Sequence, residues 1–199
     1  MRKVALIDYS SSSVSLLIAK TEGSVMESIL HTRAPLSFAG SVYQDRELTE
    51  REIPELLDIT DSFIITCKEN GVSNLYAIAS ANLASVKGID DILALVTEKT
   101  GLEIYKLDMA TEAEARIFAN ERYSILPHST LIDFGSITTK IYSFSDYISS
   151  VPLGPLTLGQ DYVSEVIPTK TEAKRMKVAI KEALDEANLP EEGFFENAV

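Results

Sequence analysis

Two aspartates stand at the ends of short apolar runs, and each is followed by a loop of small, hydroxyl-bearing residues. Asp8 precedes Tyr9 and the serine run Ser10–Ser13, and Asp133 precedes the loop at 135–139. Small residues let backbone N–H groups approach phosphate oxygens, and hydroxyl groups add donors. A carboxylate can hold Mg²⁺ through water, and Mg²⁺ neutralises the charge that develops during phosphoryl transfer. The pattern therefore predicts two phosphate loops, with Asp8 and Asp133 as metal-proximal residues.

The loops themselves supply the expected phosphate ligands. These are Ser11, Ser12 and Ser13 in the first loop and Gly135, Ser136 and Thr138 in the second. Because the same local pattern heads both halves of the chain, it indicates an internal duplication. We expect the Asp8 and Asp133 carboxylates to lie across one cleft, roughly 6–12 Å apart, where they could flank a hydrated metal ion or a phosphate group. The alternative is that each carboxylate only accepts hydrogen bonds from its own loop.

The elements that must position these loops alternate in type along the chain. The first three expected strands form an antiparallel meander, and the alternation of helices and strands from 49 to 122 implies crossover connections and a mixed α/β sheet covered by helices. The expected strands span 4–8, 14–20, 25–32, 72–79, 102–107, 130–133, 141–144 and 147–153, and the later helices span 90–101, 111–122, 158–166 and 171–187. The domains are expected at 1–123 and 124–199, each headed by one phosphate loop.

Some element boundaries can be assigned from capping signals. Thr49 and Glu52 have the spacing of a capping box for the first helix, but Pro54 favours a start one turn later. Gly71 stands where a glycine typically follows a helix C-terminus. The residues from Pro190 onward are expected to be frayed.

Composition and charge exclude several classes of protein. The 199 residues carry a net charge of −12, which disfavours binding to nucleic acid or to an anionic membrane. A single cysteine, Cys67, excludes an internal disulfide and a cysteine-based zinc site. His31 and His128 lack metal-ligand spacing. No apolar run reaches the ~20 residues of a membrane span, and the start of the chain lacks a signal peptide, so a cytoplasmic location is expected.

The segments around both loops resemble the Ppx/GppA phosphatase family, which comprises exopolyphosphatases and guanosine pentaphosphate phosphohydrolases. Ile7–Ile18 is similar to the family's first phosphate loop, Asp-(Leu/Ile)-Gly-Ser-Asn-Ser. Leu131–Gly135 resembles the start of the second loop, Ile-Asp-Ile-Gly-Gly-Gly-Ser-Thr-Glu. Further similar segments, in the same order within residues 3–165, are Pro35–Phe38, Leu48–Glu50, Ala77–Leu83, Thr100–Ile104, Glu112–Arg116 and Val151–Gly154.

The resemblance implies a fold, an activity and a cofactor. The family belongs to the actin-like ATPase superfamily, which is built from two RNase H-like halves, and this chain would hold one complete half and a partial second half. The implied activity is hydrolysis of polyphosphate or of a guanosine polyphosphate with Mg²⁺. The implied catalytic residue is Glu114, a general base that would activate water. Thr111 and Glu114 also have the spacing of a capping box, so Glu114 could instead close a helix N-terminus.

The departures from the family pattern predict weak or lost activity. Loss of arginine removes charge-assisted phosphate donors, and an isoleucine side chain obstructs the approach of backbone N–H groups to phosphate. The substitutions are Ser10 and Ser12 for glycine and asparagine, Ser37 and Ala84 for arginine, Ser136 and Ile137 for glycine, and Lys140 for an acidic residue. Lys140 is expected to be a solvated strand residue or a replacement phosphate donor. Arg33 and Arg116 are cations near the loops, and Arg116 is expected to form ion pairs on a helix surface.

Three functions remain open. The chain could be a phosphohydrolase, a non-catalytic sensor that binds a nucleotide or a phosphate chain, or a scaffold for dimerisation. A partial second half would leave an apolar sheet face and strand edges exposed, which a second copy could cover in a homodimer. The helix at 171–187 could contribute Met176, Ala179, Ile180 and Ala183 to that interface.

Overall fold

The computed structural model describes residues 2–23, 25–37, 48, 50–119, 129–143, 148–187, 189 and 197–198. The chain consists of two compact units, Met1–Met109 and Ala110–Val199. The domain boundary expected between residues 123 and 124 lies outside the described residues and stays a prediction.

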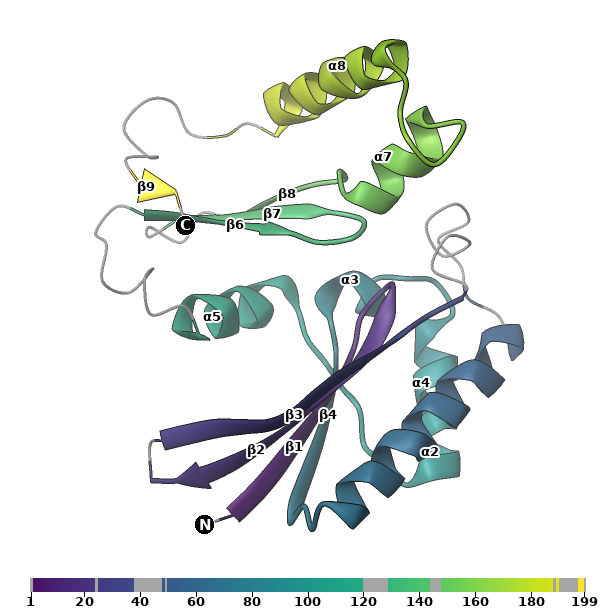
Figure 1. Ribbon diagram of the computed structural model, residues 1–199, viewed down its shortest axis with the longest axis vertical. Helices are drawn as coiled ribbons and strands as arrows, with labels where there is room; N and C mark the ends of the chain where they lie inside the picture. The colour runs from purple at the N-terminus through teal and green to yellow at the C-terminus, as the bar shows by residue number, and fades with distance from the viewer. Residues whose placement is uncertain are drawn as a thin grey trace. The chain divides into compact units, whose positions relative to one another are not determined.

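The first unit contains a five-stranded mixed sheet, of which Figure 1 labels β1 to β4. Its first three strands, β1 (Arg2–Tyr9), β2 (Ser13–Glu22) and β3 (Val25–Pro35), pair as the predicted antiparallel meander. The next strand, β4 (Asn74–Ala79), runs parallel to β1, and the short β5 (Tyr105–Lys106) runs parallel to β4. The strand order β3-β2-β1-β4-β5 contains the crossover connections that the alternation of elements predicts.

The core of the first unit lies between this sheet and two helices, α2 (Ile53–Glu69) and α4 (Ile89–Thr100). Alternate residues of β1 and β2 are buried because side chains on a strand point to opposite faces in turn. Tyr9 reaches α2 from this face, and its hydroxyl lies 2.6 Å from that of Thr60. Burial raises the pKa of Tyr9 to about 12, so the phenol is neutral. Asp8, the preceding residue of the strand, belongs to the opposite face.

Helix boundaries follow proline and glycine. α2 begins at Ile53, after the 3-10 turn η1 (Glu50–Glu52), with Pro54 in its first turn, as the proline predicted. Gly71 adopts a left-handed conformation (φ 67°) just after α2. Thr49, the predicted capping residue, lies outside the described residues, and Glu52 makes no side-chain cap. The short helix α3 (Ala81–Ala84) was not predicted.

The second unit repeats the strand order of the first. Its strands β6 (Ser129–Phe134), β7 (Thr139–Ser143) and β8 (Ile148–Val151) form an antiparallel meander, and β9 (Asn197–Ala198) pairs in parallel with β6. The order β8-β7-β6-β9 matches β3-β2-β1-β4 and supports the predicted duplication. The expectation of a frayed end is wrong at residues 197–198, because they form β9.

One helix covers a face of this second sheet. α5 (Met109–Ala119) packs against the face that carries Leu131 and Tyr142 (Figure 1). α7 (Pro155–Tyr162) and α8 (Lys170–Glu186) follow β8. α5 begins two residues before the predicted helix at 111–122, and α7 begins three residues before the predicted one at 158–166.

Candidate functional site

The first loop is a tight turn between β1 and β2. The backbone N–H of Ser10 donates to the Ser13 carbonyl at 2.8 Å, and the two hydroxyl oxygens are 3.0 Å apart. Ser11 and Ser13 are buried, whereas Ser12 is half-buried. The sequence therefore located this loop correctly. Phosphate binding by its serines stays a prediction.

A cation from β3 contacts the hydroxyl groups of this loop. The guanidinium of Arg33 donates from Nε to the Ser13 hydroxyl at 2.7 Å and from Nη2 to the Ser12 hydroxyl at 3.3 Å. Strand register brings them together, because Arg33 pairs with Ser15 across the β2–β3 ladder. The first loop therefore has a positive charge on its predicted phosphate ligands.

The two positions at which the family pattern has arginine carry no cation. Ser37 donates its N–H and its hydroxyl to the carboxylate of Glu55, at 2.8 and 2.5 Å. Ala84 is the last residue of α3. Glu55 lies in the first turn of α2, where the helix dipole favours a negative charge. Ser37 therefore holds the first turn of α2, and neither position supplies a phosphate donor of the arginine type.

The second loop joins β6 to β7 and packs tightly on the start of α7. Gly135 donates its N–H to the Thr138 carbonyl at 3.0 Å, which closes the turn. Leu156 in α7 donates its N–H to the Ser136 carbonyl at 2.9 Å. A Cβ on Gly154 would lie 2.3 Å from that carbonyl oxygen, so only glycine permits this approach. Backbone contacts of α7 therefore fix the loop. Phosphate binding by Gly135, Ser136 and Thr138 stays a prediction.

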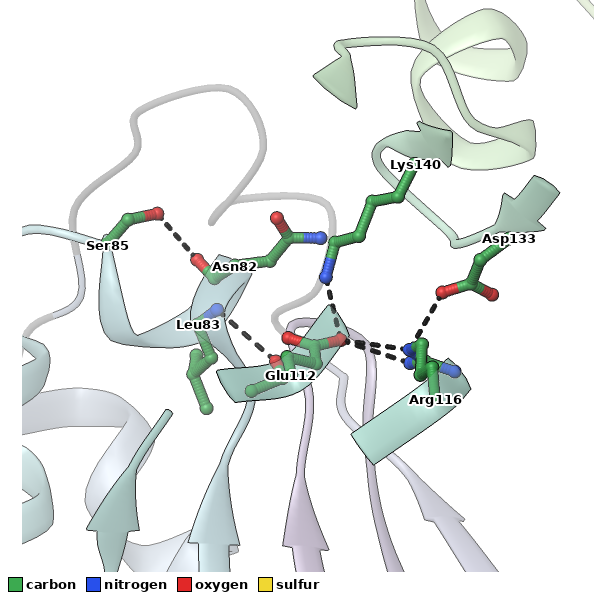
Figure 2. Close-up of polar contacts among 8 residues, drawn as sticks. Asn82, Leu83, Ser85, Glu112, Arg116, Asp133 and Lys140 are labelled. Carbon is green, nitrogen blue, oxygen red and sulfur yellow. Dashed lines mark hydrogen bonds and ion pairs between the residues drawn. The ribbon is translucent and has the colours of Figure 1, made fainter. Parts of the chain in front are cut away.

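Four charged side chains meet between α5 and the β6–β7 hairpin of the second unit (Figure 2). The Glu112 carboxylate accepts through Oε1 from Lys140 Nζ at 2.7 Å and from Arg116 Nε and Nη2 at 3.2 and 3.1 Å. Arg116 Nε also lies 3.0 Å from Asp133 Oδ2. We call Glu112, Arg116, Asp133 and Lys140 the ion network. Its two carboxylates and two cations have no net charge.

Helix period and strand register explain why these four side chains meet. Glu112 and Arg116 are four residues apart on α5 and so lie on one face of the helix. Asp133 and Lys140 pair directly across the β6–β7 ladder and so share one face of the sheet. The side chains of Lys140 and Glu112 are only 4% and 7% exposed. This pair is therefore buried, whereas Arg116 is 44% exposed.

The contacts of the ion network confirm one sequence-based prediction and contradict another. The ion pairs predicted for Arg116 are confirmed, with Glu112 and Asp133 as its partners. The prediction that Lys140 is a solvated strand residue is wrong, since register turns it toward α5. Burial lowers the pKa of Arg116 but the Asp133 and Glu112 carboxylates more than offset this, and the net pKa is raised.

Glu114, the predicted catalytic residue, is exposed on α5. The capping box predicted for Thr111 and Glu114 is wrong, because α5 begins at Met109 and Thr111 is already its third residue. Residues two apart on a helix point in widely different directions, so Glu114 faces away from the side of Glu112. Sequence reasoning missed Glu112, although its i,i+4 spacing to Arg116 was a usable signal.

Magnesium does not fit the Asp133 side of the predicted site. Mg²⁺ requires a near-octahedral shell of oxygen ligands. Asp133 is ion-paired with Arg116, and the other carboxylate of the ion network, Glu112, is bound by both of its cations. Asp8 and Asp133 belong to different units, and the separation expected between them stays a prediction.

None of the helices in the described residues is long and apolar enough to cross a membrane. A cytoplasmic location stays a prediction.

Comparison with known proteins identifies the family. The sequence pattern of the Ppx/GppA phosphatase family matches residues 17–192. Exopolyphosphatase 1 of Mycobacterium tuberculosis is 22% identical over 187 residues, which cover 92% of this chain and 54% of that protein. The chain thus spans about half the length of the curated relatives that it matches.

Solved structures show the same fold. The Aquifex aeolicus member of the Ppx/GppA family is similar with a TM-score of 0.70 and 23% identity, over 95% of this chain and 63% of that one. An exopolyphosphatase from Cytophaga hutchinsonii is similar with a TM-score of 0.77 and 16% identity, over 92% and 61%. The predicted α/β fold of the actin-like ATPase type is confirmed, and the chain belongs to the Ppx/GppA phosphatase family.

Proposed function

We propose that this chain binds a phosphoanhydride chain, either inorganic polyphosphate or a guanosine polyphosphate, and hydrolyses it slowly or not at all. Family membership supports the ligand class. The observation that carries the proposal is the Arg33 guanidinium on the hydroxyl groups of Ser12 and Ser13. Because the whole chain has a net charge of −12, a polyanion needs such a local cation.

Arg33 can serve both the loop and a ligand. A guanidinium has five N–H donors in a planar fork, and the two serine hydroxyls accept from two of its nitrogens. Arg33 is also exposed, so a phosphate oxygen could approach the remaining donors. Together with the turn at Ser10–Ser13, this arrangement supports binding of phosphate by the first unit.

Slow hydrolysis is supported by the second unit. A general base must offer a lone pair to water. Glu112, the buried acid of α5, is unsuited to this role because its Oε1 already accepts from Lys140 and Arg116. Glu114 stays the proposed base, because its carboxylate is exposed on the same helix. Mg²⁺ stays the proposed cofactor of any hydrolysis, where it would neutralise phosphate charge; Asp8 is its proposed ligand in the first unit.

The experiment measures binding and phosphate release separately. Polyphosphate and pppGpp are titrated into the protein by calorimetry, and phosphate release is followed with and without Mg²⁺. Replacing Arg33 by Met should weaken binding about tenfold, the effect of ~1.4 kcal/mol. Arg175→Met, on exposed α8, removes the same charge and should leave binding unchanged. If both substitutions weakened binding equally, Arg33 would act only through the net charge of the protein and not by contacting the ligand.

Glu114→Gln tests the hydrolysis. Since Glu114 is exposed, the substitution should change stability by less than about 0.5 kcal/mol, and it should abolish any residual phosphate release. Turnover of the wild type at ~10 s⁻¹, an ordinary enzymatic rate, would contradict the slow hydrolysis that we propose.

A homodimer is the second candidate function, with the chain as a scaffold. Two neighbouring apolar side chains between α7 and α8, Val166 and Ile167, are 97% and 78% exposed, and Val178 on α8 is 56% exposed. By contrast, Met176 and Ile180, which were predicted for the interface, are half-buried. Light scattering over a range of concentrations tests the dimer. A constant mass of 21.9 kDa would reject it.

A further inference from the structure

We propose that Lys140 and Arg116 are built-in cations that take the place of a divalent metal ion in the second unit, so that the ion network binds no Mg²⁺. The proposal concerns a binding property of the second unit and stands apart from the hydrolysis and ligand binding proposed above. It is carried by the geometry of the ion network, in which each carboxylate is already paired with a cation of the protein (Figure 2).

Position is the first argument. Lys140 projects from β7 on the same face as Asp133, its direct partner across the ladder, and its Nζ reaches Glu112 on α5 at 2.7 Å. The Arg116 guanidinium bridges the two carboxylates from the other side. A metal ion bound by the carboxylates of Asp133 on β6 and Glu112 on α5 would have to lie where these two cations lie.

Charge is the second argument. Two carboxylates and two cations sum to zero, so a divalent ion would gain no net attraction from the ion network. It would also meet two like charges at contact distance. Mg²⁺ gives up its water ligands reluctantly and usually requires carboxylates that are not already paired. The ion network offers it neither net charge nor an unoccupied Glu112 Oε1.

Burial is the third argument. Neither Lys140 nor Glu112 can leave the pair cheaply, because separation would strand a desolvated charge. The neighbour on the same face, Tyr142, is 1% exposed, and its hydroxyl has no hydrogen-bond partner among the described residues. Burial raises the pKa of Tyr142 to about 12; Arg116 lowers it, and the Asp133 and Glu112 carboxylates raise it. The phenol is thus neutral and contributes no anionic oxygen.

The decisive test creates a metal site. Lys140→Glu removes one built-in cation and adds a third carboxylate beside Glu112 and Asp133. Lys140→Met is the matched control, since it removes the cation without adding an acid. Calorimetric titration with MgCl₂ alone should show a new binding event for Lys140→Glu, at least about tenfold tighter than any event in Lys140→Met. Equal Mg²⁺ affinity in the two variants would overturn the proposal.

The wild type provides a second arm that does not depend on the folding of either Lys140 variant. Any Mg²⁺ affinity of the wild-type chain should be the same in Asp133→Asn, because the Asp133 carboxylate is already paired with Arg116. An Asp133→Asn chain that melts cooperatively but binds Mg²⁺ tenfold more weakly would assign the metal to Asp133 and refute the proposal. Both readouts are independent of phosphate release, so inactivity of the chain leaves them unaffected.

Discussion

The buried pair of Lys140 and Glu112 permits a quantitative prediction. At 2.7 Å and an effective dielectric constant of 20, their attraction is about 6 kcal/mol, and desolvation of the two ions offsets most of it. Removing one partner alone leaves a buried charge and typically costs 3–5 kcal/mol. Lys140→Met should fall at the lower end, about 3 kcal/mol, because Glu112 keeps Arg116 as a partner.

Urea denaturation followed by circular dichroism measures this cost, and a matched pair in the first unit controls for distance. Lys106 and Asp90 are also 2.7 Å apart, but their side chains are 45% and 69% exposed. Lys106→Met should therefore cost less than about 1 kcal/mol. A double variant, Lys140→Met with Glu112→Leu, should cost less than the two single substitutions added together. Equal costs for Lys140→Met and Lys106→Met would refute the reasoning, since burial is what separates the pairs.

Two further predictions concern the second unit. Gly154→Ala should destabilise the protein by about 1–3 kcal/mol, because the new Cβ would overlap the Ser136 carbonyl. Gly159→Ala, within α7 and with open space around it, should instead stabilise the protein by up to about 1 kcal/mol. Thermal melts compare the two variants, and an unchanged melting temperature for Gly154→Ala would contradict the close approach. Hydrogen bonds from the Thr169 and Ser164 backbones and hydroxyls lower the pKa of Glu172 from 4.5 to about 2, so the stability that this carboxylate contributes is present above pH 4.5 and is lost as the pH falls toward 2. The wild type should consequently melt above Glu172→Gln at pH 7, and the gap should close over that acid range; a gap that stays constant with pH would show that ionisation is not the cause.

Local signals in the sequence predicted most of the elements. Short apolar runs predicted the strands of both meanders, and the glycines at 71 and 101 predicted two helix ends. What sequence reasoning missed depends on distant partners. β9 has two residues and exists through its pairing with β6, and the place of Lys140 depends on a strand register that turns it toward α5. No local propensity encodes either contact.

Capping signals show why a local rule succeeds at one place and fails at another. Thr111 and Glu114 have the same spacing as Thr169 and Glu172, yet only the second pair forms a capping box. Pro168 directly precedes Thr169 and disfavours helical conformation in the residue before it, so α8 cannot extend backward. No proline precedes Thr111, and α5 starts at Met109, so the threonine is inside the helix. The spacing alone is therefore insufficient without a residue that stops the helix.

The two loops occupy equivalent positions in the two sheets but differ in their electrostatics. Because of this difference, we assign the proposed phosphate binding to the first unit. In the first unit, Arg33 donates to neutral serine hydroxyls and so retains its full charge for an incoming anion. In the second unit, both cations of the ion network are neutralised by ion pairs with carboxylates of the protein. A polyanion approaching a chain of net charge −12 gains attraction only from a cation that is not already neutralised. We therefore expect Arg33→Met to weaken polyphosphate binding and Lys140→Met, despite removing the same charge, to leave it within a factor of about two. Comparable losses in the two variants would mean that the second unit shares in binding the ligand.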